Sequence, residues 1–246
     1  MKHCKNCGRE LHDSFCSHCG QHTKTERITF SYLCHELVHL FTHIEKGFLF
    51  TSLRMIRFPG KTVKDFIEGR RKNYQPPISY FLIWITIYIL FLFWIEKVFG
   101  ENKVINYKEY FGPAITTKFA ITHLSIVLTA VIPFQALYLY LLVTKKTYNY
   151  FETMVATIYS LGTVILVFAV IALLIHTVSP APLDLRISDL LKVLYLVWFT
   201  FNLVKLFPVN LKFIRALAFI ILAFGTFTLW RLYGFPEIVS WFHLKK

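Results

Sequence analysis

The stretch ISYFLIWITIYILFLFWI, residues 78–95, decides the fold, because its 18 positions contain no charged side chain. A helix needs about 20 predominantly apolar residues to cross the hydrocarbon core of a bilayer. Four further apolar blocks follow at about 119–143, 154–178, 187–207 and 211–232. Helices satisfy their own backbone polar groups in lipid, so blocks of this kind are expected to be helical. The sequence therefore predicts an all-α polytopic membrane protein with about five transmembrane helices in residues 78–246.

The composition supports this assignment and excludes several other classes of protein. Hydrophobic residues make up 55% of the 246 residues, and the mean hydropathy is +0.51, whereas soluble globular proteins contain roughly 45–50% apolar residues. A soluble enzyme, a disordered chain and a secreted disulfide scaffold are therefore not expected. Residues 1–27 contain no apolar segment typical of a cleavable signal peptide, so we expect the first span to direct the chain to the membrane.

The distribution of positive charge predicts the orientation. The chain has 27 Lys and Arg against 14 Asp and Glu, a formal net charge of +13, and 13 of the 27 precede the first apolar block. Cytoplasmic segments are enriched in Lys and Arg, so the N-terminus is expected in the cytoplasm, chiefly through Arg70, Arg71 and Lys72. The fourth block is the most polar, since it includes Lys192 and Lys205. If that block does not cross the membrane, the C-terminus changes sides.

Two cysteine pairs near the N-terminus predict a metal site. Residues 4–20 read CKNCGRELHDSFCSHCG, in which a glycine follows each CxxC pair. Four sulfurs from two such turns suit tetrahedral zinc, and disulfides are disfavoured in the reducing cytoplasm. We therefore expect residues 1–27 to form a zinc ribbon with one Zn²⁺ ion, structural because four thiolates leave no open coordination position. The expected ligands are Cys4, Cys7, Cys16 and Cys19.

Residues 28–77 are expected to hold an amphipathic interfacial helix and a basic juxtamembrane segment. Apolar residues recur with helical spacing over residues 30–57, and Thr29 or Ser31 is suited to cap this helix. A short helix is expected at about residues 63–68, with Thr62 as its cap and Gly69 as its end, after a break at Pro59-Gly60.

Seven cations in this segment form a predicted lipid-phosphate site, which we call the basic collar. Its members are Arg54, Arg57, Lys61, Lys64, Arg70, Arg71 and Lys72. The alternative is that these cations act only as a topology signal.

The stretch HELVH at residues 35–39 matches the HExxH motif of zinc metalloproteases. In that motif two His bind catalytic zinc and the Glu acts as general base, roles that His35, Glu36 and His39 would take here. The only nearby third ligand is His43 on the same predicted helix, where three His bind zinc awkwardly. We therefore assign no catalytic residue and interpret the histidines as a polar helix face. A metalloprotease and a second, non-catalytic metal site are the alternatives.

The order of these features resembles a bacterial membrane family catalogued as a domain of unknown function, serial 3667. The resemblance covers about residues 4–80 and includes the double CxxCG ribbon. Further shared residues are Arg27, Ile28, Thr29, Thr42, His43, Lys46, Gly47, Thr51, Arg57, Pro59, Gly60, Gly69, Arg71, Tyr74 and Pro77. The resemblance implies a zinc-ribbon protein of the bacterial inner membrane without an assigned activity. A weaker likeness to five-span Yip1-type membrane proteins rests on the number of spans and the cytosolic N-terminus.

These observations favour a non-enzymatic adaptor or regulatory protein. We expect its ribbon to bind a cytoplasmic protein partner and its basic collar to contact anionic lipid, with nucleic acid a less expected partner for the positive charge. A transporter or lipid scramblase is a further alternative, because polar side chains within apolar blocks can line a pathway. Those residues are His123, Gln135, His176, Asn202 and Lys205. Hydrogen bonding between helices is the more common role of such residues. The sequence does not indicate an oligomeric state.

Overall fold

The computed structural model describes residues 3–39, 47–100, 117–145, 147–178, 185–207, 210–234 and 236–237. Its helices are α1 (Phe30–His39), α2 (Phe48–Arg57), α3 (Pro59–Ile67), α4 (Pro77–Phe99), α6 (Thr117–Ala130), α7 (Ile132–Leu139), α8 (Tyr150–Val178), α9 (Leu185–Val204) and α10 (Lys212–Leu229). A π-helical turn extends α7 over Tyr140–Thr144, and another extends α10 over Trp230–Gly234. Within these ranges the only β-structure is two isolated bridges in the ribbon. The expected all-α class is therefore confirmed.

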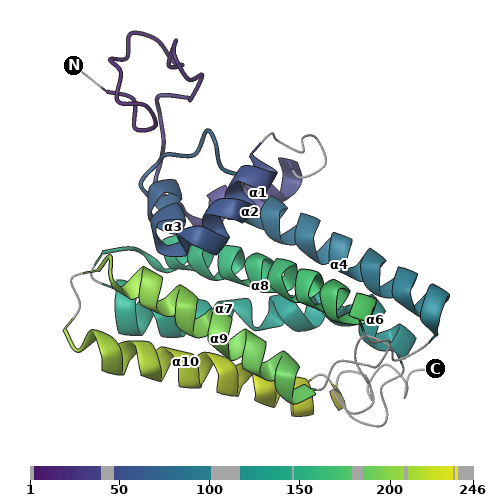
Figure 1. Cartoon of the computed structure of the whole chain (residues 1–246). Coiled ribbons are helices and arrows are strands. Elements are labelled where there is room, and N and C mark those ends of the chain that lie inside the picture. Colours follow the sequence, from purple (N-terminus) through teal and green to yellow (C-terminus); the bar gives the residue numbers. More distant parts are fainter. Residues whose placement is uncertain are drawn as a thin grey trace.

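The long helices form a bundle around α8, which contacts α4, α7 and α9 (Figure 1). Helices α9 and α10 lie side by side, as their short connection predicts. The short helices α1, α2 and α3 gather at one end of the bundle, and the N-terminal ribbon projects beyond them (Figure 1). The metal-site cysteines thus lie apart from the bundle but on the side where α4 and α8 begin.

Four helices are long and apolar enough to cross a membrane, which supports a multi-pass membrane protein. They are Pro77–Val98, Ser125–Thr144, Tyr150–Leu174 and Lys212–Gly234. The fourth predicted span forms α9, but α9 is not among the helices that qualify in the described part of the chain. The prediction of five spans is therefore not confirmed. Asp189 and Lys192 make α9 more polar than its neighbours, and they form an ion pair across one helical turn.

The predicted amphipathic helix over residues 30–57 is described at its two ends, as α1 and α2. Residues 40–46 lie outside the described part of the chain. At Gly47 an added Cβ would lie 2.7 Å from the carbonyl oxygen of Asn73, so α2 begins where the chain passes close to another backbone segment. The predicted cap of α1 is confirmed, because the backbone N–H of Tyr32 donates to Thr29 Oγ1 at 3.3 Å.

Helix α3 begins earlier than predicted. Pro59 occupies its first turn, where a missing backbone N–H costs nothing. Thr62 is therefore inside the helix, and its hydroxyl donates to the carbonyl of Phe58 at 2.9 Å instead of capping. The predicted end is confirmed, since Gly69 adopts a φ of 102°, a conformation that favours glycine.

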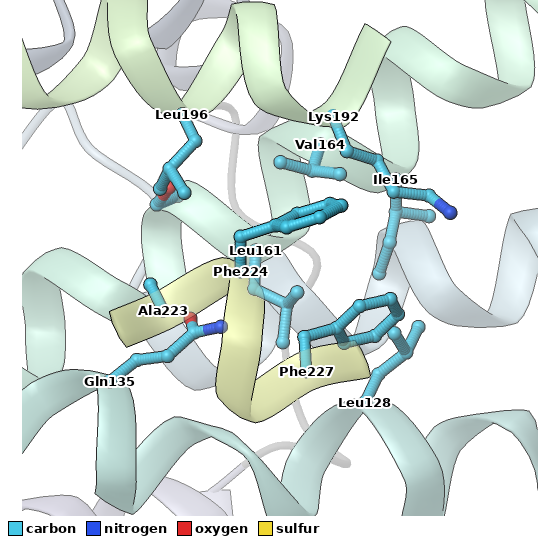
Figure 2. A pocket seen from close by; sticks show the side chains of 11 residues that line it. Leu128, Gln135, Leu161, Val164, Ile165, Lys192, Leu196, Ala223, Phe224 and Phe227 are labelled. Atoms are coloured by element: carbon cyan, nitrogen blue, oxygen red, sulfur yellow. The ribbon is translucent and has the colours of Figure 1, made fainter. Parts of the chain in front are cut away.

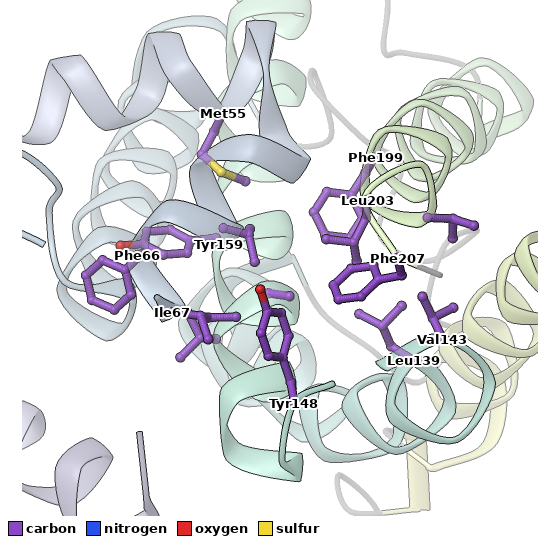
Figure 3. Close-up of a cluster of buried hydrophobic side chains, with 14 of the residues drawn as sticks. Met55, Phe66, Ile67, Leu139, Val143, Tyr148, Tyr159, Phe199, Leu203 and Phe207 are labelled. Atoms are coloured by element: carbon purple, nitrogen blue, oxygen red, sulfur yellow. The ribbon is translucent and has the colours of Figure 1, made fainter. Parts of the chain in front are cut away.

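A buried cluster joins the short helices to the bundle (Figure 3). Met55 of α2 and Phe66 of α3 lie in the same core as Tyr159 of α8 and Phe199 of α9, and each is at most 1% exposed. At Gly60 the backbones of α3 and α9 touch, because an added Cβ would overlap the carbonyl oxygen of Asn202. Helices α2 and α3 are therefore part of the core and not a layer resting on it.

We predict that Gly60→Ala destabilises the protein by about 1–3 kcal/mol, because overpacking forces the backbones of α3 and α9 apart. Gly225→Ala in α10 is the matched control, since no atom lies within 4 Å of an added Cβ there. The control should leave stability unchanged or slightly raised. Thermal unfolding of the purified proteins in detergent measures both effects. Equal midpoints for the two variants would contradict the predicted contact.

Candidate functional site

The four predicted ligand cysteines come together at one point in the ribbon. The sulfur atoms of Cys4 and Cys19 are 3.6 Å apart, as are those of Cys7 and Cys16, and all four lie within 4.8 Å of one another. Disulfide sulfurs are about 2.05 Å apart, so these cysteines are not paired covalently. Among the described residues this is the only group of three or more candidate ligands. The cluster can hold one metal ion.

Two similar turns position the four sulfurs. In each, the backbone N–H of the first cysteine donates to the carbonyl five residues on: Cys4 to Arg9 at 2.8 Å and Cys16 to Gln21 at 2.9 Å. Gly8 and Gly20 then take φ values of 78° and 69°, which favour glycine. This geometry explains why each CxxC pair is followed by glycine.

Two of the thiols have pKa values shifted in opposite directions. The backbone N–H of Cys19 holds the pKa of the Cys16 thiol down to about 6. The pKa of Cys7 is raised to about 11, because burial and the neighbouring thiols outweigh the effect of the Arg9 backbone N–H. Four thiolates at this spacing repel one another, and a divalent ion removes that repulsion. The Lys72 side chain passes over Gly20, where it adds positive charge beside the cluster.

Gln21 connects the second cysteine turn to the rest of the molecule. Its side chain is 6% exposed and makes three hydrogen bonds to the loop after α3. Its Nε2 donates to the Gly69 carbonyl at 2.8 Å, and its Oε1 accepts the backbone N–H groups of Arg71 and Lys72 at 3.1 Å each. The ribbon is therefore docked on the residue 69–72 loop and is not a free tether.

A second attachment joins the segment after the ribbon to the start of α8. Arg27 forms a two-bonded ion pair with Glu152 at 2.9 Å, and Asn149 donates to the Ile28 carbonyl at 3.0 Å. Asn149 and Glu152 also cap α8 reciprocally, each accepting the other's backbone N–H at 2.8 Å. The sequence motif Arg27-Ile28-Thr29 thus fastens the ribbon's exit to the bundle.

Several members of the basic collar have partners within the protein. Arg54 and Arg70 both pair with the buried Asp65, at 3.4 Å and 3.0 Å. Lys64 lies 3.8 Å from Glu68. These cations support the fold of α2 and α3, so they are less available to a lipid phosphate than the sequence suggested.

Arg71 also has an internal role, whereas other collar cations face outward. Its guanidinium donates to the carbonyls of Phe66 and Glu26 and lies over the Tyr32 ring, 4.9 Å from the centroid. Arg57, Lys61 and Lys72 are exposed. The structure therefore does not bring the seven collar residues into one phosphate site.

The HELVH residues do not form a metal site among the described side chains. Glu36 is 8% exposed, and its Oε1 accepts the backbone N–H groups of Ile78 and Ser79 at 2.7 Å and 3.3 Å, which caps α4. His35 is exposed, and the side chain of His39 lies outside the described part, as does His43. Burial raises the pKa of Glu36 to about 7 against the lowering effect of those two N–H groups and of Arg71.

A cavity of about 90 Å³ lies between the long helices (Figure 2). Its polar lining is Gln135 of α7, Ser160 of α8 and Lys192 of α9. Its apolar lining is Leu128, Leu161, Val164, Ile165, Leu196, Ala223, Phe224 and Phe227. Lys192 pairs with Asp189 at 3.2 Å, and Asp189 pairs with Arg231 at 3.3 Å. These three charges therefore neutralise one another in part at one end of the bundle.

The predicted polar pathway is not assembled in the described residues. Of its five members only Gln135 lines the cavity. Asn202 donates to the Trp198 carbonyl at 2.9 Å, Lys205 and His123 are not in the lining, and the side chain of His176 lies outside the described part.

Sequence reasoning missed the roles of Gln21, Asp65, Glu152, Asp189 and Arg231. Gln21 and Glu152 act on distant parts of the chain, namely residues 69–72 and Arg27. The Asn149–Glu152 spacing carries a local signal, that of a capping box, and Asp189 and Lys192 have the spacing of an ion pair within one helical turn.

We predict that the raised pKa of Glu36 makes stability fall with rising pH. Between about pH 4.5 and 7 the folded state keeps a proton that the unfolded state has released, so the free energy of unfolding decreases by up to about 1.4 kcal/mol per pH unit. Glu36→Gln should weaken this dependence, whereas Glu10→Gln, at an exposed site, should keep it. Denaturation across this pH range measures the slopes. Parallel profiles for wild type and Glu36→Gln would refute the assignment.

Comparison with known proteins places one segment of the chain in a family. Residues 45–89 match the model described as protein of unknown function (DUF3667). No curated protein matches the chain, and no solved structure does. The matched segment includes α2, α3 and the first part of α4. The match confirms the predicted resemblance to the family of unknown function with serial 3667 over residues 45–89, whereas the cysteine ribbon lies outside the matched residues.

Proposed function

We propose that this integral membrane protein is a non-enzymatic adaptor or regulatory protein whose metal-bound ribbon sets the conformation of the membrane-proximal segment. The observation that carries the proposal is the docking of Gln21, next to a cysteine turn, on the loop of residues 69–72. We place the protein in the bacterial inner membrane with a cytoplasmic N-terminus, in line with the excess of Lys and Arg before the first span.

Zinc is the proposed metal. Thiolates bound at about 2.3 Å in a tetrahedron lie about 3.8 Å apart, close to the 3.6 Å separations of the two sulfur pairs. Four sulfur donors favour zinc over harder cations. One Zn²⁺ on Cys4, Cys7, Cys16 and Cys19 would have no open position, so its role is structural. A ribbon this short has little core, and the ion would supply much of its folding free energy.

The ribbon offers a surface for a cytoplasmic protein partner. Phe15 is 60% exposed, and its ring meets that of His22 edge to face at 4.9 Å between centroids. An exposed aromatic residue held by a metal-folded turn is a common anchor at protein interfaces. We therefore propose that a partner binds the ribbon while Gln21 transmits its effect to the loop of residues 69–72.

Two other functions have less support. A metalloprotease using His35, Glu36 and His39 needs Glu36 as a base, yet this carboxylate caps α4 and is buried. A transporter or scramblase is favoured by one observation, the cavity between α7, α8, α9 and α10. Vesicles containing the protein would show ion flux or lipid movement if that function were present.

We predict one zinc ion per chain in the purified protein by elemental analysis. Changing Cys4 and Cys16 together to Ser should abolish binding, because each cysteine turn then loses a ligand. Changing His35 and His39 together to Ala is the control and should leave one zinc. Two zinc ions per chain, with one lost in the histidine variant, would instead support the metalloprotease.

We predict that Gln21→Leu releases the residue 69–72 loop without loss of zinc. Three hydrogen bonds at about 0.5–1.5 kcal/mol each should protect the loop amides by at least about tenfold. Hydrogen exchange in residues 69–75 should therefore accelerate in Gln21→Leu and after zinc removal from the wild type. His12→Gln, at an exposed ribbon position, is the matched control. Unchanged exchange after zinc removal would overturn the proposed coupling.

A further inference from the structure

Helix α2 has an outward face of apolar side chains, and its two hydroxyl groups are buried on the inside together with Met55. Leu49, Leu53 and Ile56, spaced by about one helical turn, are 70%, 58% and 41% exposed. Thr51 and Ser52 are 0% and 4% exposed. A helix at a water-facing surface has the opposite pattern, so this face of α2 is suited to hydrocarbon.

The buried hydroxyl groups have partners within the protein, so their burial is a stable arrangement. Thr51 Oγ1 accepts the backbone N–H of Gln75 at 2.8 Å. The Ser52 hydroxyl donates to the Phe48 carbonyl at 3.0 Å and accepts from the indole N–H of Trp84 at 3.2 Å. The orientation of α2 is therefore fixed, and its outward apolar face is not an effect of loose packing.

Two tryptophans indicate the depth of α2 in the membrane. Trp84 of α4 donates to Ser52, and Trp198 of α9 donates to the Ile56 carbonyl at 3.3 Å. Tryptophan is enriched at the boundary between headgroups and acyl chains. Trp198 is itself 48% exposed, and Leu194, one turn earlier in α9, is 55% exposed. The apolar face of α2 is therefore continuous with the lipid-facing surface of a bundle helix.

Two exposed cations lie where α2 meets α3. Arg57 ends α2 and Lys61 lies in the first turns of α3. In the described part of the chain neither has an ion-pair partner, unlike Arg54, Lys64 and Arg70 of the same collar. Cations beside an interfacial apolar face attract the phosphates of anionic lipids.

We propose that α2 is a membrane anchor that lies in the plane of the bilayer and binds anionic phospholipid of the adjacent leaflet. The lipid tails cover Leu49, Leu53 and Ile56, and the lipid phosphate binds Arg57 and Lys61. This inference rests on the proposed function in one respect only, namely which side of the membrane α2 lies on. Leu33 of α1, by contrast, is 5% exposed and packs inside the protein, so the lipid-facing residues belong to α2.

Photo-crosslinking in nanodiscs that contain phosphatidylglycerol tests the apolar face. Benzoylphenylalanine introduced at Leu53, and separately at Leu49, should crosslink to lipid, as detected by the mass of the adduct. The same probe at the exposed Glu68 is the control and should give no lipid adduct. Crosslinks from both apolar positions to a second copy of the chain or to another protein would overturn the proposal, as would the absence of lipid adducts.

Lipid affinity tests the two cations. The double variant Arg57→Gln with Lys61→Gln should bind short-chain phosphatidylglycerol about 30-fold more weakly in native mass spectrometry. Arg9→Gln with Lys24→Gln, at exposed ribbon positions, is the matched double variant and should bind as the wild type does. Equal weakening in both double variants would refute a specific phosphate site. Zinc content separates this result from the proposed function, because it should stay at one ion per chain in both double variants.

Discussion

Gly60 brings the backbone of α3 against the carbonyl of Asn202 in α9, where a side chain of any size would overlap it. This contact fixes α3, and with it the buried Asp65 that neutralises Arg54 and Arg70. The loop after α3 then meets Gln21 of the ribbon. This close approach of two helices is therefore one of the contacts that connect the ribbon and the short helices to the bundle, beside the Arg27–Glu152 ion pair. The family match covers residues 45–89, so it includes Gly60 and Asp65 but neither Asn202 nor Gln21.

The sequence predicted the features that depend on local patterns. The apolar block at residues 78–95 forms α4, and the spacing of the four cysteines brings their sulfurs within 4.8 Å of one another. Long-range packing decided the features that it did not predict. Gly47 precedes α2 and lies close to the backbone of Asn73, a contact that the helical periodicity of residues 30–57 does not indicate. Thr62 has the chemistry of a cap but lies inside α3, because Pro59 can start the helix earlier.

The roles of the charged residues likewise depend partly on local sequence and partly on long-range contacts. Counting Lys and Arg gives an orientation, but it does not separate cations with internal partners from those that face outward. Arg71 is one of the seven collar cations predicted to bind lipid phosphate, yet it donates to two backbone carbonyls and covers an aromatic ring. Glu36 matched a catalytic motif and instead caps α4. The contacts of Arg71 with Glu26 and of Glu36 with Ile78 join residues more than 40 positions apart, so local sequence patterns do not reveal them.

The length of α8 has a consequence for how the ribbon is presented. Its 29 residues extend about 43 Å at 1.5 Å per residue, whereas the hydrocarbon core is about 30 Å thick. Glu152 lies in its first turn and pairs with Arg27 at the ribbon's exit, so the ribbon is attached to the first turn of a helix that is longer than the hydrocarbon core is thick. This attachment holds the ribbon in a fixed position relative to α8. The proposed protein partner would therefore meet the ribbon at a fixed height above the bilayer and in a fixed direction.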